Sequence, residues 1–475
     1  EFRRVLFRSG RNDLLTENNA DVLADYNGDG AVTSFTIPSD LNGAARVFGS
    51  SVDLGAYELQ QDICFVSNTD GSYTGATSEI RDGLSNILQI AVDQATAGST
   101  VRIAGNCISS SAAPPSALMT IDKDLTVQGG YPVDVNNVPD FNAVPNPVAN
   151  PTLLNGANST QGIVVNSGMV TLTGLVVEES RVDGINVRGG TTTLTNSITR
   201  QNSGRGLVNG ATIDITASDF NNNIGGIANY GVMTVDNSTI SDNTLNGGIA
   251  SGGRTSIDNS TIQNNSTVNS GGGIFVFGNG DLTLTNSTIS GNFAEGNNVS
   301  PFQLAATGGG GIFAQVDSFG TVSLDIRNNT IENNTTDVAG GGLNLNDNSL
   351  ESLWTVSNNI IRGNTAERGG GLYIGSLVLA QIEGNLLTGN STSGLGGGVY
   401  ADSVPSGFGF VITVFRSFND QDTPALLANN TISANDAPEV GGIYVAGLIS
   451  LHNSIVWGNS NLDIAAGSGV PPADL

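Results

Sequence analysis

The clearest ligand-like stretch of the sequence is Asp25-Tyr-Asn-Gly-Asp-Gly30, where oxygen-bearing side chains recur at every second residue. Asp25, Asn27 and Asp29 match positions 1, 3 and 5 of a calcium-binding loop, with the glycine at its sharp turn. The twelfth position falls on Thr36, so the bidentate acid of a complete loop is missing. The three residues are a candidate site for weakly bound Ca²⁺, and the alternative is an ordinary Asx-Gly turn.

A second candidate lies in a phrase that the chain repeats. Asn-Ser-Thr-Ile begins at Asn237 and again at Asn259, and the preceding residues are Asp236 and Asp258. If the two copies stack, these carboxylates lie one strand spacing, ~4.8 Å, apart. Clustered acids serve in hydrolases and in Ca²⁺-dependent lyases, so the pair is a weak catalytic candidate. The alternative is an ordinary pair on a solvated surface.

Aromatic side chains suggest a third kind of site. An insertion between two copies of the phrase contains four phenylalanines, which could stack on sugar rings: Phe408, Phe410, Phe415 and Phe418. Insertions in repeat proteins often form loops on the binding face. The alternative is an extra hairpin that packs its own aromatic side chains.

The composition limits the partners of the protein. Its 475 residues carry a formal charge of −26, with one lysine, Lys123, and one histidine, His452. Such an acidic chain repels phosphate backbones, so we expect no nucleic-acid partner. No apolar run reaches the ~18 residues of a membrane-spanning helix. Cys64 and Cys107 are either a single disulfide or two buried thiols.

The repeated phrase predicts the architecture. Variants of it recur about every 20–24 residues, with longer insertions at some intervals, which is typical of a solenoid. Each unit contains short β-prone runs separated by Asn and Gly, and helical periodicity is absent from 162 to 464. The sequence therefore predicts an all-β fold, a single-chain right-handed parallel β-helix of about a dozen rungs.

Stacked rungs would align identical residues along the axis. Val235 with Ile257, and Ile240 with Ile262, are expected to form apolar columns inside the coil. Two amide ladders are expected at the bends, one through Asn237, Asn259 and Asn286 and one through Asn243, Asn265 and Asn292. The Gly-Gly pairs before the other apolar run are expected to supply positive-φ turns and close contact between rungs.

The sequence resembles two families of bacterial β-helix proteins. Gly-Gly-Ile/Leu/Val followed by Asn-x-Thr-Ile-x-x-Asn is similar to the repeats of polymorphic outer-membrane proteins, over about residues 100–464. "DLNGAARVFGSSVDLGAYE", residues 40–58, resembles the closing segment of choice-of-anchor β-helix proteins. "NSIVWGNSNLDI", residues 453–464, is similar to the segment that comes before such an ending. This inverted order implies an excerpt from a longer protein with tandem β-helix units.

These observations divide the chain into segments. Residues 1–11, rich in arginine, are expected to be a cloning or assembly scar, and 12–60 the remnant of a preceding unit. Residues 61–100 are expected to hold a linker and a capping helix over 78–97, capped by Thr77 or Ser78. The β-helix is expected over 101–464, followed by a truncated tail over 465–475. We also expect the last rungs, from 429 to 464, to fray or self-associate in isolation.

The sequence supports two hypotheses about function. The first is a non-enzymatic stalk or adhesin-like protein, extracellular or on the bacterial cell surface or outer membrane. Its side loops would bind surfaces, glycans or proteins, with Ca²⁺ as its one candidate cofactor. The alternative is a polysaccharide lyase, hydrolase or epimerase with a lateral substrate groove, because this fold often hosts such enzymes.

Overall fold

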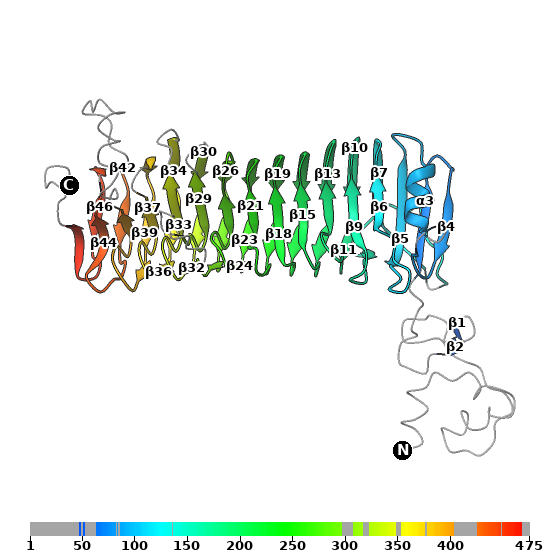
Figure 1. Ribbon diagram of the computed structural model, residues 1–475, viewed down its shortest axis with the longest axis horizontal. Coiled ribbons are helices and arrows are strands. Elements are labelled where there is room, and N and C mark those ends of the chain that lie inside the picture. The colour runs from blue at the N-terminus through cyan, green and yellow to red at the C-terminus, as the bar shows by residue number, and fades with distance from the viewer. Residues whose placement is uncertain are drawn as a thin grey trace, which may run out of the picture.

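The computed structural model describes residues 47–48, 51–52, 63–81, 83, 86–134, 136–296, 307–316, 323–347, 353–375, 378–402, 425–447 and 449–467. Strands dominate this part of the chain, and α3 (Ile87–Gln94) is its only α-helix. The strands wind into one long coil that begins beside α3 and ends at β47 (Leu462–Ala466), as Figure 1 shows. A short antiparallel pair, β1 (Val47–Phe48) and β2 (Ser51–Val52), lies nearer the N-terminus.

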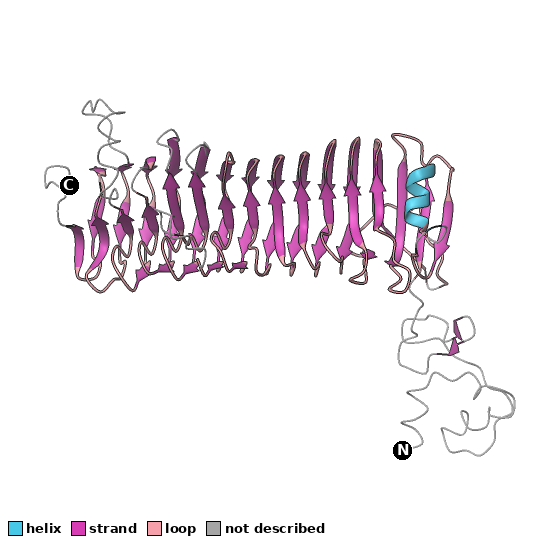
Figure 2. Ribbon diagram, in the orientation of Figure 1, coloured by secondary structure: helices cyan, strands magenta, loops and turns pink. Residues whose placement is uncertain are grey.

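The coil has three long faces of strands that pair in parallel from one rung to the next (Figure 2). The first face consists of β5 (Thr100–Ile108), β7 (Leu125–Tyr131), β10 (Met169–Thr173), β13 (Thr191–Thr195), β16 (Thr212–Thr216), β19 (Val232–Asp236), β22 (Arg254–Asp258), β26 (Asp281–Thr285), β30 (Ser323–Arg327), β34 (Leu353–Ser357), β38 (Leu379–Glu383), β42 (Ala425–Ala428) and β45 (Ser450–His452). The second face consists of β8 (Thr152–Asn155), β11 (Leu175–Glu178), β14 (Ile198–Arg200), β17 (Asp219–Asn221), β20 (Thr239–Ser241), β23 (Thr261–Gln263), β27 (Thr288–Ser290), β31 (Thr330–Glu332), β35 (Ile360–Arg362), β39 (Leu386–Thr388), β43 (Thr431–Ser433) and β46 (Ile455–Trp457).

The third face is a sheet of 13 strands, so the coil has about the dozen rungs that the repeat predicts. It consists of β6 (Ala117–Ile121), β9 (Gln161–Val165), β12 (Ile185–Val187), β15 (Arg205–Asn209), β18 (Gly225–Asn229), β21 (Ile249–Ser251), β25 (Ile274–Val276), β29 (Ile312–Val316), β33 (Leu343–Asp347), β37 (Leu372–Ile374), β41 (Val399–Ala401), β44 (Val440–Val445) and β47. A short fourth sheet joins β24 (Ser266–Thr267), β28 (Phe293–Ala294), β32 (Thr335–Thr336), β36 (Thr365–Ala366) and β40 (Ser391–Thr392).

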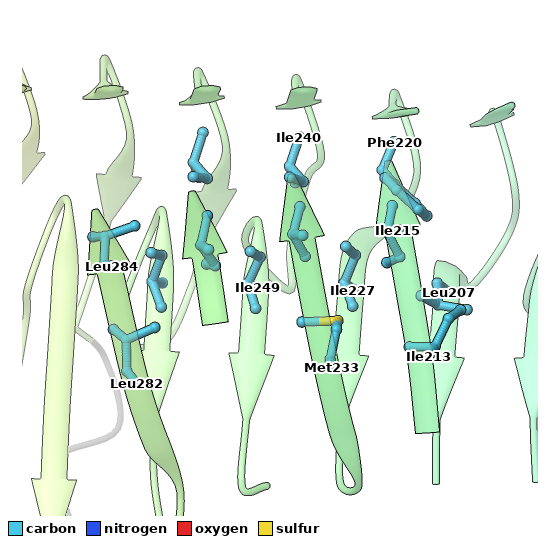
Figure 3. Close-up of a cluster of buried hydrophobic side chains, with 14 of the residues drawn as sticks. Leu207, Ile213, Ile215, Phe220, Ile227, Met233, Ile240, Ile249, Leu282 and Leu284 are labelled. Atoms are coloured by element: carbon cyan, nitrogen blue, oxygen red, sulfur yellow. The ribbon is translucent and has the colours of Figure 1, made fainter. Parts of the chain in front are cut away.

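The apolar columns inside the coil confirm the predicted register. Val235 pairs with Ile257 and Ile240 with Ile262 on successive rungs, and all four side chains are buried. The same inner positions hold Leu, Ile, Met and Phe on the neighbouring rungs, so one continuous core runs along the axis (Figure 3). The alternation of buried and outward residues on each strand therefore sets which side chains are free to act on the surface.

One of the two predicted amide ladders forms. The Asn243 side-chain amide donates to Asn265 Oδ1 at 2.8 Å, and that of Asn265 donates to Asn292 Oδ1 at 3.0 Å. The ladder extends in both directions as an unbroken row through Asn202, Asn223, Asn243, Asn265, Asn292, Asn334, Asn364, Asn390, Asn435 and Asn459. We call this row the asparagine ladder.

The other predicted amide ladder is wrong. Asn237, Asn259 and Asn286 are exposed at turns with φ of 47°, 46° and 50°, where asparagine is one of the few residues tolerated. Their side chains donate to the carboxylates of Asp236 or Asp258 rather than to one another. The hydrogen bonds that do cross the rungs at this bend are made by the residue after each of these asparagines. Its backbone N–H donates to a Ser or Asn side chain on the next rung, as Ser238 N does to Ser260 Oγ.

The second glycine of each Gly-Gly pair permits the close contact between rungs that the sequence predicts. A Cβ on Gly248 would lie 2.6 Å from Gly273 O and 2.9 Å from Asn265 Nδ2. Both atoms belong to rigid parts of the coil, because one is backbone and the other is part of the asparagine ladder. The glycine is therefore required by packing, whereas Gly247 before it has φ of 71° and is required by the turn.

We expect Gly248→Ala to lower the free energy of unfolding by about 2 kcal/mol, because the added methyl forces two rungs apart. The matched control is Gly210→Ala, whose Cβ would meet only Val187 O at 3.6 Å and should change stability little. Urea denaturation of both variants measures the difference. Equal stability of the two variants would show that the rungs can separate without loss.

The N-terminal end of the coil is covered by more than the predicted helix. Strand β3 (Cys64–Asn68) pairs antiparallel with both β4 (Thr74–Thr77) and β5, so a hairpin occupies the edge of the first face. Helix α3 packs beside this hairpin and against β6, and it buries Ile87, Leu88, Ala91 and Val92. The hairpin pairs with the edge of β5 and the helix covers this end of the coil, which protects it from pairing with other chains.

The predicted start of the helix is wrong. Its N-cap is Asn86, whose Oδ1 accepts a hydrogen bond from Gln89 N at 3.2 Å, rather than Thr77 or Ser78. Ile80 is instead a buried bridge partner of Ser109. Gly83 has φ of 73°, which interrupts any helix running from 78 to 97.

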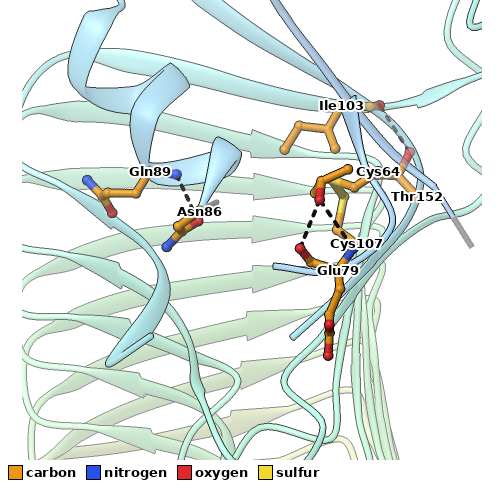
Figure 4. The surroundings of a disulfide bond; sticks show 8 residues. Cys64, Glu79, Asn86, Gln89, Ile103, Cys107 and Thr152 are labelled. Atoms are coloured by element: carbon orange, nitrogen blue, oxygen red, sulfur yellow. Dashed lines mark hydrogen bonds between the residues drawn. A yellow bond between two sulfur atoms is a disulfide. The ribbon is translucent and has the colours of Figure 1, made fainter. Parts of the chain in front are cut away.

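Cys64 and Cys107 form a disulfide, which decides the alternative that the sequence left open. It joins β3 to β5 across 43 residues, next to α3 and the first rung (Figure 4). Lys123 also has a partner that the sequence did not indicate, since its Nζ donates to the Ala95 carbonyl at 2.7 Å and to the Asp93 carbonyl at 3.0 Å. A lysine at these carbonyls satisfies the C-terminal end of α3.

Asp70 fixes the turn between β3 and β4 to the end of α3. Its carboxylate accepts hydrogen bonds from Ser72 and, at 2.6 Å, from Thr96 N. The hydrogen bond from the Ser72 hydroxyl, then those from Thr96 and the Ser72 backbone, hold the pKa of Asp70 well below its usual range. This contribution to stability is present above the unfolded-state pKa, near ~3.9, and is lost as the pH falls through the lower folded-state pKa.

We therefore expect acid to loosen the N-terminal cap before the middle of the coil. Protection factors of the α3 amides, corrected for intrinsic exchange rates, should fall between about pH 4 and pH 2 in the wild type. Asp70→Asn should show weaker protection at neutral pH and little further change in acid. A wild-type profile that stays flat over this range would contradict the assignment.

Candidate functional site

The acidic pair lies where the repeat predicts, on the outer side of the first face. Asp236 and Asp258 are register partners on β19 and β22, so their Cα atoms are one strand spacing apart. The same column continues through Thr285, Arg327, Ser357, Glu383, Ala428 and His452. The pair therefore belongs to a mixed outer column of the sheet, as the sequence indicates.

Hydrogen bonds from neighbouring side chains engage both carboxylates. Asp236 Oδ2 accepts from Asn237 Nδ2 at 2.6 Å. Asp258 accepts from Asn259 Nδ2 at 2.8 Å, from Thr285 Oγ1 at 2.6 Å and from Asn286 Nδ2 at 2.8 Å. The Thr285 hydroxyl is the main cause of a lowered pKa of Asp258. A general acid needs a raised pKa, so Asp258 is suited to remain ionised rather than to deliver a proton.

A cation site would need more ligands than this pair supplies. Within the described residues, no group of three or more His, Cys, Asp or Glu side chains is arranged to hold a metal ion. Arg327, which belongs to the same column, forms an ion pair with Asp325 on its own strand. The predicted calcium ligands Asp25, Asn27 and Asp29 lie outside the described residues.

The aromatic residues that the sequence singled out, Phe408, Phe410, Phe415 and Phe418, also lie outside the described residues. The structure instead places other aromatic rings in a row on the outer side of the third face. We call this row the aromatic ladder, and it consists of Phe275, Phe313, Tyr373, Tyr400 and Tyr444, with Asn344 between the second and third rings. Phe275 stacks on Phe313 at 5.4 Å between ring centroids, and Tyr373 stacks on Tyr400 at 5.6 Å.

The aromatic ladder could have been found in the sequence. Each ring directly follows the apolar residue of the Gly-Gly-Ile/Leu/Val phrase, as in Gly-Gly-Ile-Phe275 and Gly-Gly-Leu-Tyr373. That position faces outward when the apolar residue faces inward. The glycines of the phrase alone do not predict this row of rings.

The tyrosines of the ladder form a buried polar cluster. Tyr373 donates a hydrogen bond from its hydroxyl to Asp402, and Arg368 lies over the Tyr400 ring at 6.0 Å. Burial, with the nearby Asp402 charge, raises the pKa of both Tyr373 and Tyr400. The two hydroxyls therefore stay protonated at neutral pH and are unsuited to act as bases. Tyr373 is fully buried against Ala339, and the rings serve packing between the third face and its glycine-rich loops.

The comparisons with known proteins give one result. The family model for the right handed beta helix region matches residues 161–300 and 227–404. Together the two matches span just over half of the 475-residue chain. Neither the curated proteins nor the solved structures contain a significant match. Among the described residues, no helix has the length and hydropathy needed to cross a membrane.

Proposed function

The chain belongs to the right-handed β-helix family, and on that premise we propose that it is a non-enzymatic extracellular or cell-surface stalk, adhesin-like in function. The observation that carries the proposal is the unbroken asparagine ladder, which is buried from Asn202 to Asn435 and ends at the partly exposed Asn459. Such a row stiffens the coil along its axis, because each rung donates to the next through both backbone and side chain. A rigid rod with outward side chains suits presentation of binding surfaces.

Two further observations support this proposal over an enzyme. Asp236 and Asp258, the candidate catalytic pair, both accept hydrogen bonds from neighbouring side chains. The lowered pKa of Asp258 does not suit a proton donor. The Cys64–Cys107 disulfide favours an oxidising compartment outside the cytoplasm. The partners of such a stalk would be surfaces, glycans or proteins, and the chain's charge of −26 disfavours polyanions.

We expect the purified protein to bind bacterial or host surfaces without turning over polysaccharides. The test measures both retention on cells and release of reducing or unsaturated ends from a panel of acidic and neutral polysaccharides. The double variant Asp236→Asn/Asp258→Asn should bind as the wild type does. Turnover by the wild type that disappears in this variant would overturn the proposal and establish the alternative of a lyase, hydrolase or epimerase.

A further inference from the structure

The outer side of the first face carries a regular array of threonines on three adjacent rungs. Strands β10, β13 and β16 pair in register, and their outward residues form three rows: Met169, Thr171 and Thr173; Thr191, Thr193 and Thr195; Thr212, Asp214 and Thr216. Threonine fills all but two of these positions. We call this array the threonine grid.

The side chains of the grid are held in a fixed lattice. Successive rows are one strand spacing, ~4.8 Å, apart, and successive outward residues along a strand are about 6.7 Å apart. Threonine is β-branched and therefore restricted at χ1, which fixes both its hydroxyl and its methyl group. Buried Val170, Leu172, Leu194, Ile213 and Ile215 support the strands from inside the coil.

The grid is free to contact an external partner. Thr191 is exposed, and Thr171, Thr193 and Thr195 are partly exposed. Within the described part of the chain, the hydroxyls of these threonines have no protein partner. A Thr hydroxyl can donate one hydrogen bond and accept others, so each grid position can match either a donor or an acceptor.

The grid carries less charge than several other rungs of the same face, although Thr126 and Gln128 on β7 and Thr355 and Ser357 on β34 are also uncharged at these columns. Asp214 is the only charged residue in its three rows, and its carboxylate accepts a hydrogen bond from Thr234 Oγ1 on the next rung at 2.6 Å. The corresponding outward positions of β22 are Arg254, Ser256 and Asp258, and those of β30 are Ser323, Asp325 and Arg327.

We propose that the threonine grid binds ice. The partner must be uncharged, because the grid is nearly neutral on a molecule with a charge of −26. It must be an ordered solid, because the outer side of a sheet buries little of a small ligand, whereas many weak contacts add up over a lattice. It must offer hydrogen-bond donors and acceptors at repeats near those of the grid, as the oxygens of hexagonal ice do. The grid has no aromatic ring on which a sugar could stack, which disfavours a polysaccharide.

The substitution that tests the proposal is Thr193→Tyr, at the centre of the middle row. Its matched control is Thr283→Tyr, at the same outward column on β26 but beyond the grid, next to Ser256 and Asp325. Both sites face outward over a packed core, so both variants should fold. Circular dichroism and thermal unfolding check this, and Thr171→Tyr provides a second grid variant should Thr193→Tyr unfold.

The measurement is the concentration of the full chain in ice grown slowly on a cooled probe, relative to the liquid. We expect wild type and Thr283→Tyr to be enriched in the ice. The ice-to-liquid concentration ratio of Thr193→Tyr should be at least tenfold lower than that of the wild type. Exclusion of the wild type from ice, or equal enrichment of the two variants, would overturn the proposal. Retention on microcrystalline cellulose but not in ice would also overturn it and assign the grid to a polysaccharide. The proposed stalk function stands or fails separately, on the cell-binding and turnover test.

Discussion

Replacing Asn265 by alanine should lower the free energy of unfolding by about 4 kcal/mol. The Asn265 side chain is fully buried in the asparagine ladder. Its Oδ1 accepts from Asn243 N at 3.1 Å and from Asn243 Nδ2 at 2.8 Å, and its Nδ2 donates to Ile240 O at 2.9 Å and to Asn292 Oδ1 at 3.0 Å. Truncation leaves several of these buried groups without a partner, and each unsatisfied group costs about 1–3 kcal/mol.

The matched control is Asn259→Gly, six residues earlier in the same repeat. Asn259 is exposed at a positive-φ turn, and its amide donates to Asp258 Oδ2. Glycine adopts that backbone conformation freely, so stability should change by less than about 0.5 kcal/mol. Denaturant unfolding measures the change in the free energy of unfolding of each variant. Hydrogen exchange on the rungs around 243 and 292 shows which amides lose protection. Similar effects of the two substitutions would contradict the distinction between ladder and turn.

Removing the disulfide should destabilise the N-terminal cap by about 4 kcal/mol, the chain-entropy expectation for a closed loop of this size. The bond spans 43 residues and joins β3 to β5, so the unfolded cap gains freedom when it is absent. The double variant Cys64→Ala/Cys107→Ala tests this without leaving a free thiol. We expect loss of amide protection over 64–108 while protection near residues 230–290 is retained.

The control for this prediction is treatment of both proteins with a reducing agent. Reduced wild type should resemble the double variant, and reductant should have no effect on the double variant itself. If the oxidised wild type and the variant unfold at the same denaturant concentration, the hairpin, α3 and the Asp70 contacts hold the cap without the covalent link.

Most of the coil could be predicted from local sequence. The period aligned Val235 with Ile257 and Ile240 with Ile262, because a repeated backbone places like residues at like positions. The Gly-Gly pairs were assigned to close contact between rungs, and the clash that a Cβ on Gly248 would produce agrees with this. These predictions succeeded because each depends on one repeat and its neighbour alone.

The candidate site was less predictable. Asp236 and Asp258 were expected to face outward one rung apart, and they do, but the hydrogen bonds that lower the pKa of Asp258 come from Thr285 and Asn286 on the next rung. The two asparagines of one phrase also diverge. Asn265 enters the buried ladder whereas Asn259 turns outward, because backbone φ at the bend, rather than residue type, decides where an amide points.

The sequence by itself determined the rung: its length, its inward and outward positions, and the glycines at which neighbouring rungs meet. These properties follow from alternation and period, which are local. Only the tertiary structure decided the partner of Lys123, the pairing of Cys64 with Cys107, and the threonine grid. Each of these depends on residues that lie far apart in the chain and come together only when the coil winds, so no single repeat contains the information.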